Sequence, residues 1–297
     1  MKEFSGKRIV IDISIYLYKF SAEKNLIESI YLMISIFKYY NIIPIFIFDG
    51  KPPVEKKKLL LKRMFDKQKA EQEYNLLKEN LKTINEEEKR EIQTTMDFLR
   101  KQFIYIRKEE IEEVKDLIRA CGCIYYDAPG EADELCVWMV LEKKAWACLS
   151  EDMDMFVYGC PNVLRYISLL NHTCVLYETK GILENLRITQ KEFREICVVS
   201  GTDYNKQNGL HLYKTLELFK KFRKENKVST ETFYPWLIND QHISKEDAET
   251  LQKIFEMFNF SEEKMVGLEK WFNHKSMNPV VKKDLETVLK RHGFIFP

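Results

Sequence analysis

Short apolar runs alternate with stretches of helical spacing along the first fifty residues. Arg8–Asp12 has the pattern of a buried strand that ends in an acid. From about Asn25 to Asn41, apolar side chains recur every three or four residues, which is typical of a helix. Pro44–Phe48 is a second apolar, branched run, and Asp49 follows it. This order predicts a strand–helix–strand unit, the signature of a parallel sheet covered by helices.

The character of the chain changes from about Glu55 to Phe98. Lys, Glu and Gln dominate this stretch, and neither glycine nor proline occurs between Pro53 and Gly122. We therefore predict a long, polar helical insertion that is poorly suited to burial. A solvent-exposed charged face is the simplest interpretation of such a run when it is taken alone.

The alternating pattern resumes after the insertion. Further strands are expected at 123–126 and 146–149, followed by a hairpin of 163–167 and 174–177; helices are expected at 108–121, 131–143, 180–185 and 190–200. Beyond Tyr204 the pattern is helical, with breaks near Asn208-Gly209, Pro235, Asn239 and Pro279. The whole pattern predicts an α/β fold with a central, mostly parallel sheet and helices on both faces.

The composition narrows the class of protein without naming a function. Apolar residues make up 45% and charged residues 31%, which excludes a disordered tail, a collagen-like chain and a coiled-coil rod. The formal net charge of +1 says nothing about partners, so any nucleic-acid argument must come from local patches. Charged residues and Pro44 interrupt the long apolar runs, so we expect no membrane span and no membrane partner.

The cysteine and histidine patterns argue against zinc and against a disulfide framework. Seven cysteines form no CxxC pair, and five histidines form no HxxxH pair. We therefore expect reduced, packed thiols in an intracellular protein.

Acidic side chains follow the strands of the predicted sheet at the points where the strands end. Asp12, Asp49, Asp152 and Asp154 end or follow strands, Glu131 and Asp133 open a helix directly after a strand, and Asp203 follows the end of an apolar helix. The carboxyl ends of parallel strands lie along one edge of a sheet, where ligands bind, so we expect these acids to converge.

Such a cluster needs counter-charge, because neighbouring carboxylates raise each other's pKa. Mg²⁺ and Mn²⁺ take oxygen ligands and keep several waters, which leaves room for phosphate oxygens. Two such ions about 4 Å apart can activate a water and stabilise the leaving oxygen of a phosphodiester. The cluster thus predicts a two-metal phosphodiesterase.

Other interpretations exist for each acid alone. A single Asp after a strand is commonly a helix cap or a turn residue, and Glu131 and Asp133 could merely complement a helix dipole. Asp152-Met-Asp154 is similar to the DxD pair of phosphatases that use an aspartyl nucleophile. That pair belongs on the first strand and is followed by Thr or Val, whereas Met155 follows here. The repeated placement of the acids favours the metal site.

Five ordered sequence blocks carry a family resemblance. They are Val10-Ile-Asp12, Phe48-Asp-Gly-Lys-Pro-Pro53, Asp127-Ala-Pro-Gly-Glu-Ala-Asp133, Glu151-Asp-Met-Asp154 and Gly201-Thr-Asp-Tyr204. The chain resembles the flap endonuclease family, which includes the xeroderma pigmentosum group G type of structure-specific 5′ nucleases. The resemblance implies a PIN-like sheet, a helical arch insertion at about 54–106, and a helix-two-turn-helix-like C-terminal region.

The resemblance also implies a division into domains and an activity. Residues 1–203 would form the nuclease core, with an N-terminal region 1–98 and an internal region 107–203, and residues 204–297 would form a helical duplex-binding region. The activity implied is cleavage of DNA at junctions between duplex and a 5′ single-stranded flap, with two Mg²⁺ ions for which Mn²⁺ can substitute. Asp12, Asp49, Glu131 and Asp133 match the ligands around one ion. Asp133, Asp152, Asp154 and Asp203 match those around the other, some of them through water. Asp133 stands where the family usually has Glu, so the bridging geometry could shift.

Several basic and aromatic residues match further positions of the family. Lys56 and Arg63 match its catalytic basic pair, and their spacing of seven residues puts them on one helix face. Tyr18 matches an aromatic side chain on which a base stacks. Arg100 and Lys101, at the end of the polar insertion, are candidates for contacts with flap phosphates, and an exposed salt-bridged helix is the alternative.

Two departures from the family pattern limit what the resemblance implies. In Asn208-Gly-Leu-His-Leu-Tyr-Lys214 the usual glycine-rich turn keeps one glycine, which puts the monovalent-cation site in question. The following helix carries Lys214, Lys220 and Lys221, which are candidates for contacts with DNA phosphates. His292–Phe296 is not the pattern used to dock on a sliding clamp, so we expect no clamp docking by this segment.

These features lead to a Mg²⁺-dependent, structure-specific 5′ flap endonuclease with 5′–3′ exonuclease activity in DNA replication, repair or recombination. We expect a monomer that works in the nucleus or at a cytoplasmic viral replication site. The alternatives are a ribonuclease or 5′ exonuclease on the same core, and a catalytically silent scaffold. The intact acid set argues against the scaffold.

Overall fold

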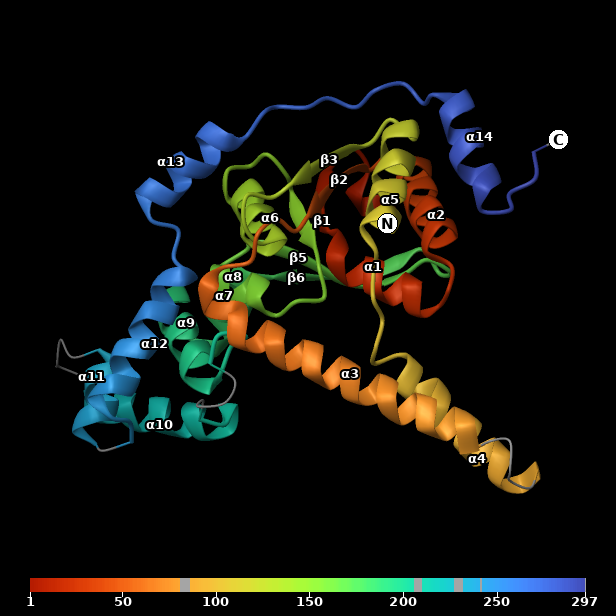
Figure 1. Ribbon diagram of the computed structural model, residues 1–297. Helices are drawn as coiled ribbons and strands as arrows, with labels where there is room; N and C mark the ends of the chain where they lie inside the picture. The colour runs from red at the N-terminus through yellow and green to blue at the C-terminus, as the bar shows by residue number, and fades with distance from the viewer. Residues whose placement is uncertain (81–85, 206–209, 227–231, 241, 297) are drawn as a thin grey trace.

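The computed structural model describes residues 1–80, 86–205, 210–226, 232–240 and 242–296. A six-stranded sheet lies at its centre, in the order β3-β2-β1-β4-β5-β6 (Figure 1). Its strands are β1 (Arg8–Asp12), β2 (Ile43–Phe48), β3 (Ile124–Asp127), β4 (Ala147–Leu149), β5 (Asn162–Ser168) and β6 (Thr173–Glu178). The first five are parallel, and β6 pairs antiparallel with β5. The carboxyl ends of β1, β2 and β4 therefore open on the same edge.

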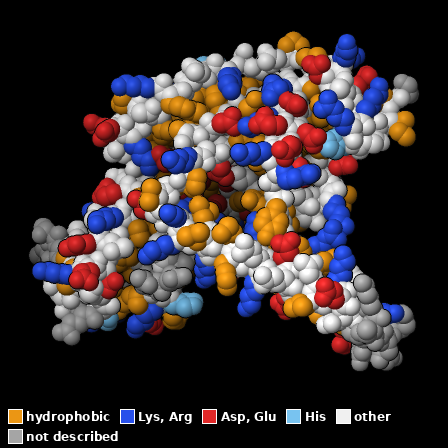
Figure 2. Space-filling model, in the orientation of Figure 1, with side chains coloured by type: hydrophobic (Ala, Val, Ile, Leu, Met, Phe, Trp, Pro, Cys, Tyr) orange, Lys and Arg blue, Asp and Glu red, His pale blue; other side chains and the backbone are white. Residues whose placement is uncertain are grey.

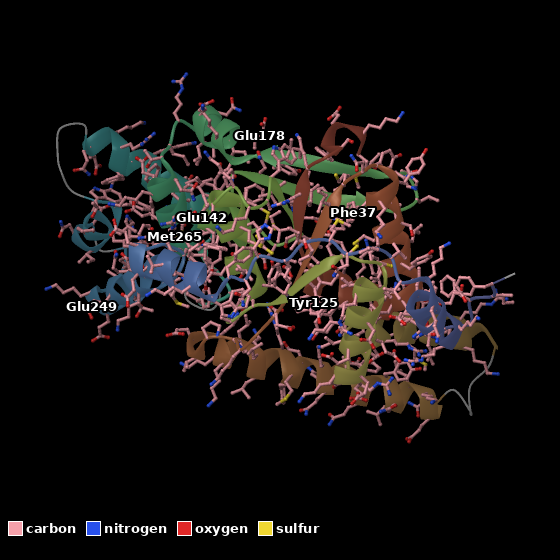
Figure 3. All side chains as sticks on the ribbon, turned by 90° about the horizontal axis from the view of Figure 1, so that it is seen from above. Phe37, Tyr125, Glu142, Glu178, Glu249 and Met265 are labelled. Carbon is pink, nitrogen blue, oxygen red and sulfur yellow. The ribbon has the colours of Figure 1, made fainter. Side chains whose placement is uncertain are left out.

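The strands β1, β2 and β4 are buried on both faces, which explains why they are almost continuously apolar. Along β1, Ile9 and Ile11 pack into one core with the helices α1 (Ile13–Ala22), α2 (Leu26–Tyr39) and α5 (Lys108–Ala120). Val10, which points the other way, packs into a second core with α6 (Ala132–Leu141). In the view from above, Phe37 of α2 and Met265 lie on opposite sides, with the strands between them (Figure 3).

A helical arm leaves the sheet after β2. It consists of a short 3-10 turn, η2 (Val54–Lys56), and the helices α3 (Lys57–Asn80) and α4 (Glu86–Arg100), which run side by side away from the sheet (Figure 1). Among the residues described for α3, Ala70 alone is buried. The rings of Tyr74 and Phe103 lie 5.4 Å apart, and the Lys67 ammonium donates to the carbonyl of Ile104 at 2.8 Å. The polar insertion is thus a helical arm with little core of its own.

Most of the remaining helices gather beside the second core (Figure 1). They are α7 (Asp154–Tyr158), α8 (Thr179–Leu186), α9 (Gln190–Ser200), α10 (Leu212–Glu225), α11 (Phe233–Asn239), α12 (Lys245–Met257) and α13 (Glu262–Trp271). Phe233 packs its ring against Phe219, Phe222 and Trp236, which joins α10 to α11. The helices α9 and α12 lie next to the base of α3 (Figure 1).

An extended segment, residues 272–281, carries the chain back across the sheet to α14 (Lys282–Arg291) (Figure 1). The backbone N–H of Asn278 donates to the carbonyl of Gly122 at 3.1 Å, and that of Val281 donates to Ala120 at 3.0 Å. The helix α14 then packs on α5. The N-terminal segment contains one short 3-10 helix, η1 (Lys2–Phe4). In the part of the chain described, no helix is long and apolar enough to cross a membrane.

The structure corrects one predicted helix break and adds two helices. Pro235 does not end a helix, because it lies in the first turn of α11, where a backbone N–H has no intrahelical partner. The breaks at Asn239 and Pro279 are confirmed, whereas the break at Asn208-Gly209 lies outside the described residues. The helices α1 and α7 were not expected from the sequence pattern.

Candidate active site

The carboxylate at the end of β1 is buried. It belongs to Asp12, which is also the N-cap of α1: Oδ1 accepts a hydrogen bond from the Ser14 backbone N–H at 3.2 Å, and Oδ2 accepts one from the Ser150 hydroxyl at 3.1 Å. Only 6% of Asp12 is exposed. Burial, together with the negative charges of Asp49 and Asp152, raises the pKa of Asp12 to about 7. At neutral pH this carboxyl group is therefore poised between its two charge states.

Asp49 follows β2 and joins the ends of two other elements. Its Oδ1 accepts a hydrogen bond from the backbone N–H of Ala132, the first residue of α6, at 2.8 Å. Its other carboxylate oxygen accepts one from the Ser14 hydroxyl. The N-terminus of a helix carries a partial positive charge, which stabilises a carboxylate placed there. These bonds hold Asp49 between the starts of α1 and α6, beside Asp12.

The start of α6 contributes two further acids. Glu131 is the N-cap residue, and Asp133 lies in the first turn and is 8% exposed. Burial and the charge of Glu131 raise the pKa of Asp133 well above its usual range, Asp12 and Asp152 add to the effect, and Lys56 opposes it. Carboxylates from three separate elements therefore share one electrostatic environment.

The turn after β4 carries Asp152 and Asp154. The Asp152 backbone N–H donates to the Ser150 hydroxyl oxygen at 3.1 Å, and Asp152 Oδ1 accepts from the Asp154 backbone N–H at 2.8 Å. These bonds shape the turn that leads into α7. Glu151, from the same sequence block, faces β5 instead. Its Oε1 accepts the backbone N–H of Tyr166 at 2.6 Å and so ties this turn to β5.

Two cations from the start of the arm reach the acids. The Lys56 ammonium forms an ion pair with Glu131 and lies 3.8 Å from Asp203 Oδ2, and Arg63 Nη2 is 2.7 Å from the same oxygen. Burial lowers the pKa of Lys56, but its hydrogen bond to Glu131 and the charges of Glu131, Asp133 and Asp203 outweigh burial and raise it. Lys56 therefore stays charged at neutral pH. Acidic side chains are visible in the hollow between the sheet and α3, with Lys and Arg along its rim (Figure 2).

The chemistry of this donor set fits a hard divalent cation. All the donors are carboxylate oxygens, and two of them belong to buried acids whose pKa values are raised by burial and by other acids. Within the described residues, no group of three or more His, Cys, Asp or Glu side chains is arranged to hold a metal ion as it stands. Glu131 and Asp203 instead bind Lys56 and Arg63. Coordination would therefore require some of these side chains to turn from their present partners.

Three other predicted contact residues lie on α1 and at the end of the arm. Tyr18 is 45% exposed, and the Lys67 ammonium lies 4.6 Å from the centre of its ring. Arg100 is the last residue of α4 and Lys101 follows it, and both are exposed. The Tyr18 ring therefore lies beside α3. Arg100 and Lys101 are accessible at the C-terminal end of α4.

The three predicted lysines of α10 are exposed as well. The Lys214 ammonium lies 3.6 Å from a carboxylate oxygen of Glu217, and that of Lys221 lies 2.6 Å from Asp240. Among the described residues, no ion pair or hydrogen bond joins Lys214, Lys220 or Lys221 to the seven acids. The three lysines lie on α10, which packs on α9.

Three residues of the site were not expected from the sequence. The Ser14 hydroxyl donates to Asp49, the Ser150 hydroxyl donates to the buried Asp12, and the hydroxyl of Tyr204 donates to Glu131 Oε2 at 2.6 Å. Tyr204 stands directly after Asp203 in a block that carries the family resemblance, so its position was a usable signal. The two serines had no such signal, because each acts through a contact distant in the sequence.

Two regions of the chain match family descriptions. Residues 1–70 match the XPG N-terminal domain, and residues 122–203 match the XPG I-region. The two ranges together cover just over half of the 297 residues. They contain all seven acids and both cations of the site.

Curated relatives and solved structures agree with these matches. Flap endonuclease 1 of Aedes aegypti is 27% identical over 247 residues, which are 77% of this chain and 62% of that protein. The catalytic core of Rad2 in complex with DNA substrate superposes with a TM-score of 0.67 at 18% identity, covering 98% of this chain and 89% of that one. The Holliday junction-resolving enzyme GEN1, in complex with product DNA and a Mg²⁺ ion, gives 0.58 at 17% identity, with 98% and 66% covered.

The structure thus has an α/β fold with a central, mostly parallel sheet, and acids from several elements gather at the carboxyl edge of that sheet. The chain belongs to the family of XPG and flap endonuclease proteins. It spans less than two thirds of the length of the Aedes relative that it matches.

Proposed function

We propose that this chain is a divalent-metal-dependent, structure-specific 5′ flap endonuclease with associated 5′–3′ exonuclease activity on DNA. The observation that carries the proposal is the burial of Asp12 and Asp133 among other carboxylates, with Lys56 and Arg63 brought to the same edge. Membership of a nuclease family and likeness to proteins described as flap endonuclease, or as bound to DNA, support the choice of substrate.

The acids would hold the metal ions. We assign Asp12, Asp49, Glu131 and Asp133 to one ion, and Asp133, Asp152, Asp154 and Asp203 to the other. Bound Mg²⁺ would neutralise the phosphate and lower the pKa of a bound water. The Ser14 and Ser150 hydroxyls hold the Asp12 and Asp49 carboxylates in place, so less reorganisation is needed when substrate arrives.

Lys56 and Arg63 would act on the phosphate. Both cations now rest on carboxylates, and both come from the first residues of the arm. When an anionic phosphodiester approaches, each can turn from its carboxylate toward the developing negative charge. Such an exchange of partners frees Glu131 and Asp203 at the same time.

The remaining residues would guide the DNA. We propose that residues 1–203 are the nuclease core, that the arm at about 54–106 admits the single-stranded flap, and that residues 204–297 hold duplex. Tyr18 would stack on a base near the cut, Arg100 and Lys101 would contact flap phosphates, and Lys214, Lys220 and Lys221 would contact the duplex backbone. The protein would act as a monomer.

A panel of end-labelled substrates tests the specificity. The 5′-flap DNA, blunt duplex DNA, single-stranded DNA and an RNA flap of the same sequence are incubated with Mg²⁺ and equal enzyme. We expect the DNA flap to be cut fastest, near the base of the flap. Faster cutting of RNA, or removal of nucleotides from blunt duplex without flap incision, would replace the proposal by a ribonuclease or a 5′ exonuclease on the same core.

A further inference from the structure

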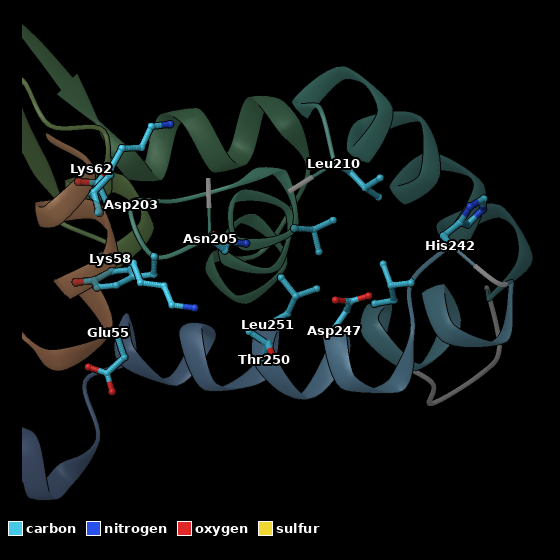
Figure 4. Close-up of a pocket in the computed structure, with 14 residues that line it drawn as sticks. Glu55, Lys58, Lys62, Asp203, Asn205, Leu210, His242, Asp247, Thr250 and Leu251 are labelled. Atoms are coloured by element: carbon cyan, nitrogen blue, oxygen red, sulfur yellow. The ribbon is translucent and has the colours of Figure 1, made fainter. Parts of the chain in front are cut away.

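A recess of about 370 Å³ lies between the first turns of α3 and the helices α9 and α12 (Figure 4). Its walls come from α3, from the end of α9 with the turn that follows, and from α12 with the loop before it. Asp203 and Tyr204 line one end of the recess, and both also contact the candidate active site. A chain of nucleotides that crosses the site could therefore continue into the recess.

The lining combines apolar and cationic parts. Leu59, Val199, Leu210, Ile243 and Leu251 supply apolar surface, and α3 supplies Lys58 and Lys62. Pockets that bind organic ligands have this composition, with an apolar wall and a few polar groups that fix orientation. The volume lies within the usual range for such sites, about 300–1,000 Å³.

Among the described residues, the two lysines of the recess lack partners. Within that part of the chain, neither Lys58 nor Lys62 forms an ion pair or a hydrogen bond, and the Lys58 ammonium points into the recess (Figure 4). They stand one helical turn apart, where like charges destabilise a helix slightly. Lys62 and the adjacent Arg63 project from α3 in directions about 100° apart. Arg63 therefore contacts Asp203 from one face of α3, while Lys62 lines the recess from another.

The acids that line the recess are engaged or turned away. Asp203 accepts a hydrogen bond from Arg63. Asp247 accepts one from the Ser244 hydroxyl at 2.7 Å, in the capping box of α12. The carboxylate of Glu55 is directed away from the middle of the recess (Figure 4). The positive charge of the lysines is therefore available to an anionic ligand.

We propose that this recess binds one nucleotide of the substrate strand, with its phosphate on Lys58 and Lys62 and its base or sugar against Ile243 and Leu251. The inference rests on the proposed function and extends it, because it adds a nucleotide site beyond the scissile phosphate. Phosphate contacts of this kind fix the position of a strand without reading its sequence.

Binding of a fluorescent 5′-flap DNA in Ca²⁺, followed by anisotropy, tests the phosphate contact. Lys58→Gln/Lys62→Gln is compared with Lys57→Gln/Lys69→Gln, which removes the same charge from exposed positions of α3 outside the recess. We expect the first pair to weaken binding about five- to tenfold and to lower the slope of log K against log salt by about 1, with little effect of the control pair. Equal effects of the two pairs would overturn the proposal.

An abasic site moved along the strand tests the contact with the base. At one position next to the junction, loss of the base should weaken binding by the same factor as Leu251→Ala, and the two changes together should cost no more than either alone. Additive losses at every position would contradict the assignment.

A further titration tests the nucleotide site even if the proposed flap endonuclease function is wrong. If the wild-type chain binds no flap DNA, titration with deoxyadenosine monophosphate is followed through the backbone amide signals of Thr250 and Leu251. Shifts that disappear in Lys58→Gln/Lys62→Gln support a nucleotide site even then. No shifts would overturn it.

Discussion

The hydroxyl of Tyr204 supports one of the candidate metal ligands. It donates to Glu131 Oε2 at 2.6 Å, while Lys56 binds the other oxygen of the same carboxylate. The Tyr204 ring rests against Phe258 with the centroids 5.5 Å apart, which anchors it to the end of α12. Burial, with the hydrogen bond to Glu131, raises the pKa of Tyr204, so it remains a donor at any working pH. Tyr204 is thus a positioning residue for Glu131.

Replacing Tyr204 by Phe should weaken the response to metal without weakening DNA binding. The change removes a hydrogen bond that orients a ligand, and losses of such supporting bonds typically cost 10–100-fold in metal affinity or activity. We expect kcat at limiting Mg²⁺ to fall about tenfold, KM for DNA to stay unchanged, and higher Mg²⁺ to restore part of the rate.

Tyr234→Phe is the matched control, because the buried hydroxyl of Tyr234 has no hydrogen-bond partner in the described structure. Its Mg²⁺ dependence should equal that of the wild type. A Tyr204→Phe enzyme with the same Mg²⁺ dependence would show that Glu131 needs no such support.

Among the elements, the strands and the longer helices were predictable because local pattern and burial agree. The strands β1 and β2 are apolar almost throughout because both faces of the sheet are covered. Asp12 and Asp49 could be placed at the carboxyl edge because they mark the ends of these two strands. The helix α1 was missed because it begins directly after the strand, with Asp12 serving as both strand end and N-cap. The helix break predicted at Pro235 was wrong because proline is tolerated in the first turn of a helix, where Pro235 lies.

The contacts inside the candidate site could not be predicted from local pattern. Glu131 lies 75 residues from Lys56 and 73 from Tyr204, and Asp203 lies 140 residues from Arg63. These pairs depend on how α3 and the turn after α9 are placed against the sheet. The sequence pattern predicted which residue types gather at the edge, while their pairing depends on tertiary packing.

The helix α9 carries two glutamates with opposite titration behaviour. Burial raises the pKa of Glu195, which is 7% exposed. Burial also acts on Glu192, but the hydrogen bonds from Thr189 and the charge of Arg223 outweigh it and lower its pKa. An acid whose pKa is raised on folding costs stability above its unfolded pKa, and an acid whose pKa is lowered contributes stability there.

Glu195→Gln should therefore stabilise the protein at neutral pH and lose its advantage as the pH falls toward 4. Glu192→Gln should destabilise it at neutral pH, with the difference disappearing as the pH falls through the lowered pKa of Glu192. Urea unfolding of both variants between pH 2 and 8 measures these differences. Parallel curves for the two variants would contradict the assignment of opposite shifts.

Across the whole molecule, the C-terminal segment connects regions that are far apart. Residues 272–281 leave α13 beside the second core and deliver α14 to α5 beside the first, so the segment crosses the sheet (Figure 1). The segment passes close to Gly122, whose φ is +70° and where a Cβ would lie 2.1 Å from the carbonyl oxygen of Asn278. The segment can follow this path only where residue 122 has no side chain.

Gly122→Ala should loosen this segment. Gly6→Ala is the matched control, since Gly6 also has a left-handed φ, of +75°, but its Cβ would meet no atom within 4 Å. We expect Gly6→Ala to cost about 1–2 kcal/mol of unfolding free energy from the backbone alone. Gly122→Ala should cost more and should speed cleavage by trypsin after Lys275.

Limited proteolysis followed by mass spectrometry distinguishes the two variants. If trypsin cleaves after Lys275 equally slowly in both, the segment is not held by its contact with Gly122.

Cleavage of an end-labelled double-flap DNA with Mg²⁺ tests the central claim, that the acidic edge and its two cations form a phosphodiesterase site for 5′ flaps. The reaction is compared with Ca²⁺ in place of Mg²⁺, with Asp154→Ala, and with Lys56→Ala beside the exposed control Lys57→Ala. We predict incision near the base of the flap with the wild type and Lys57→Ala. We predict loss of incision with Ca²⁺ or Asp154→Ala, and a fall of about 10²-fold or more with Lys56→Ala. Incision that persists with Asp154→Ala, or no Mg²⁺-dependent incision by the wild type, would contradict it.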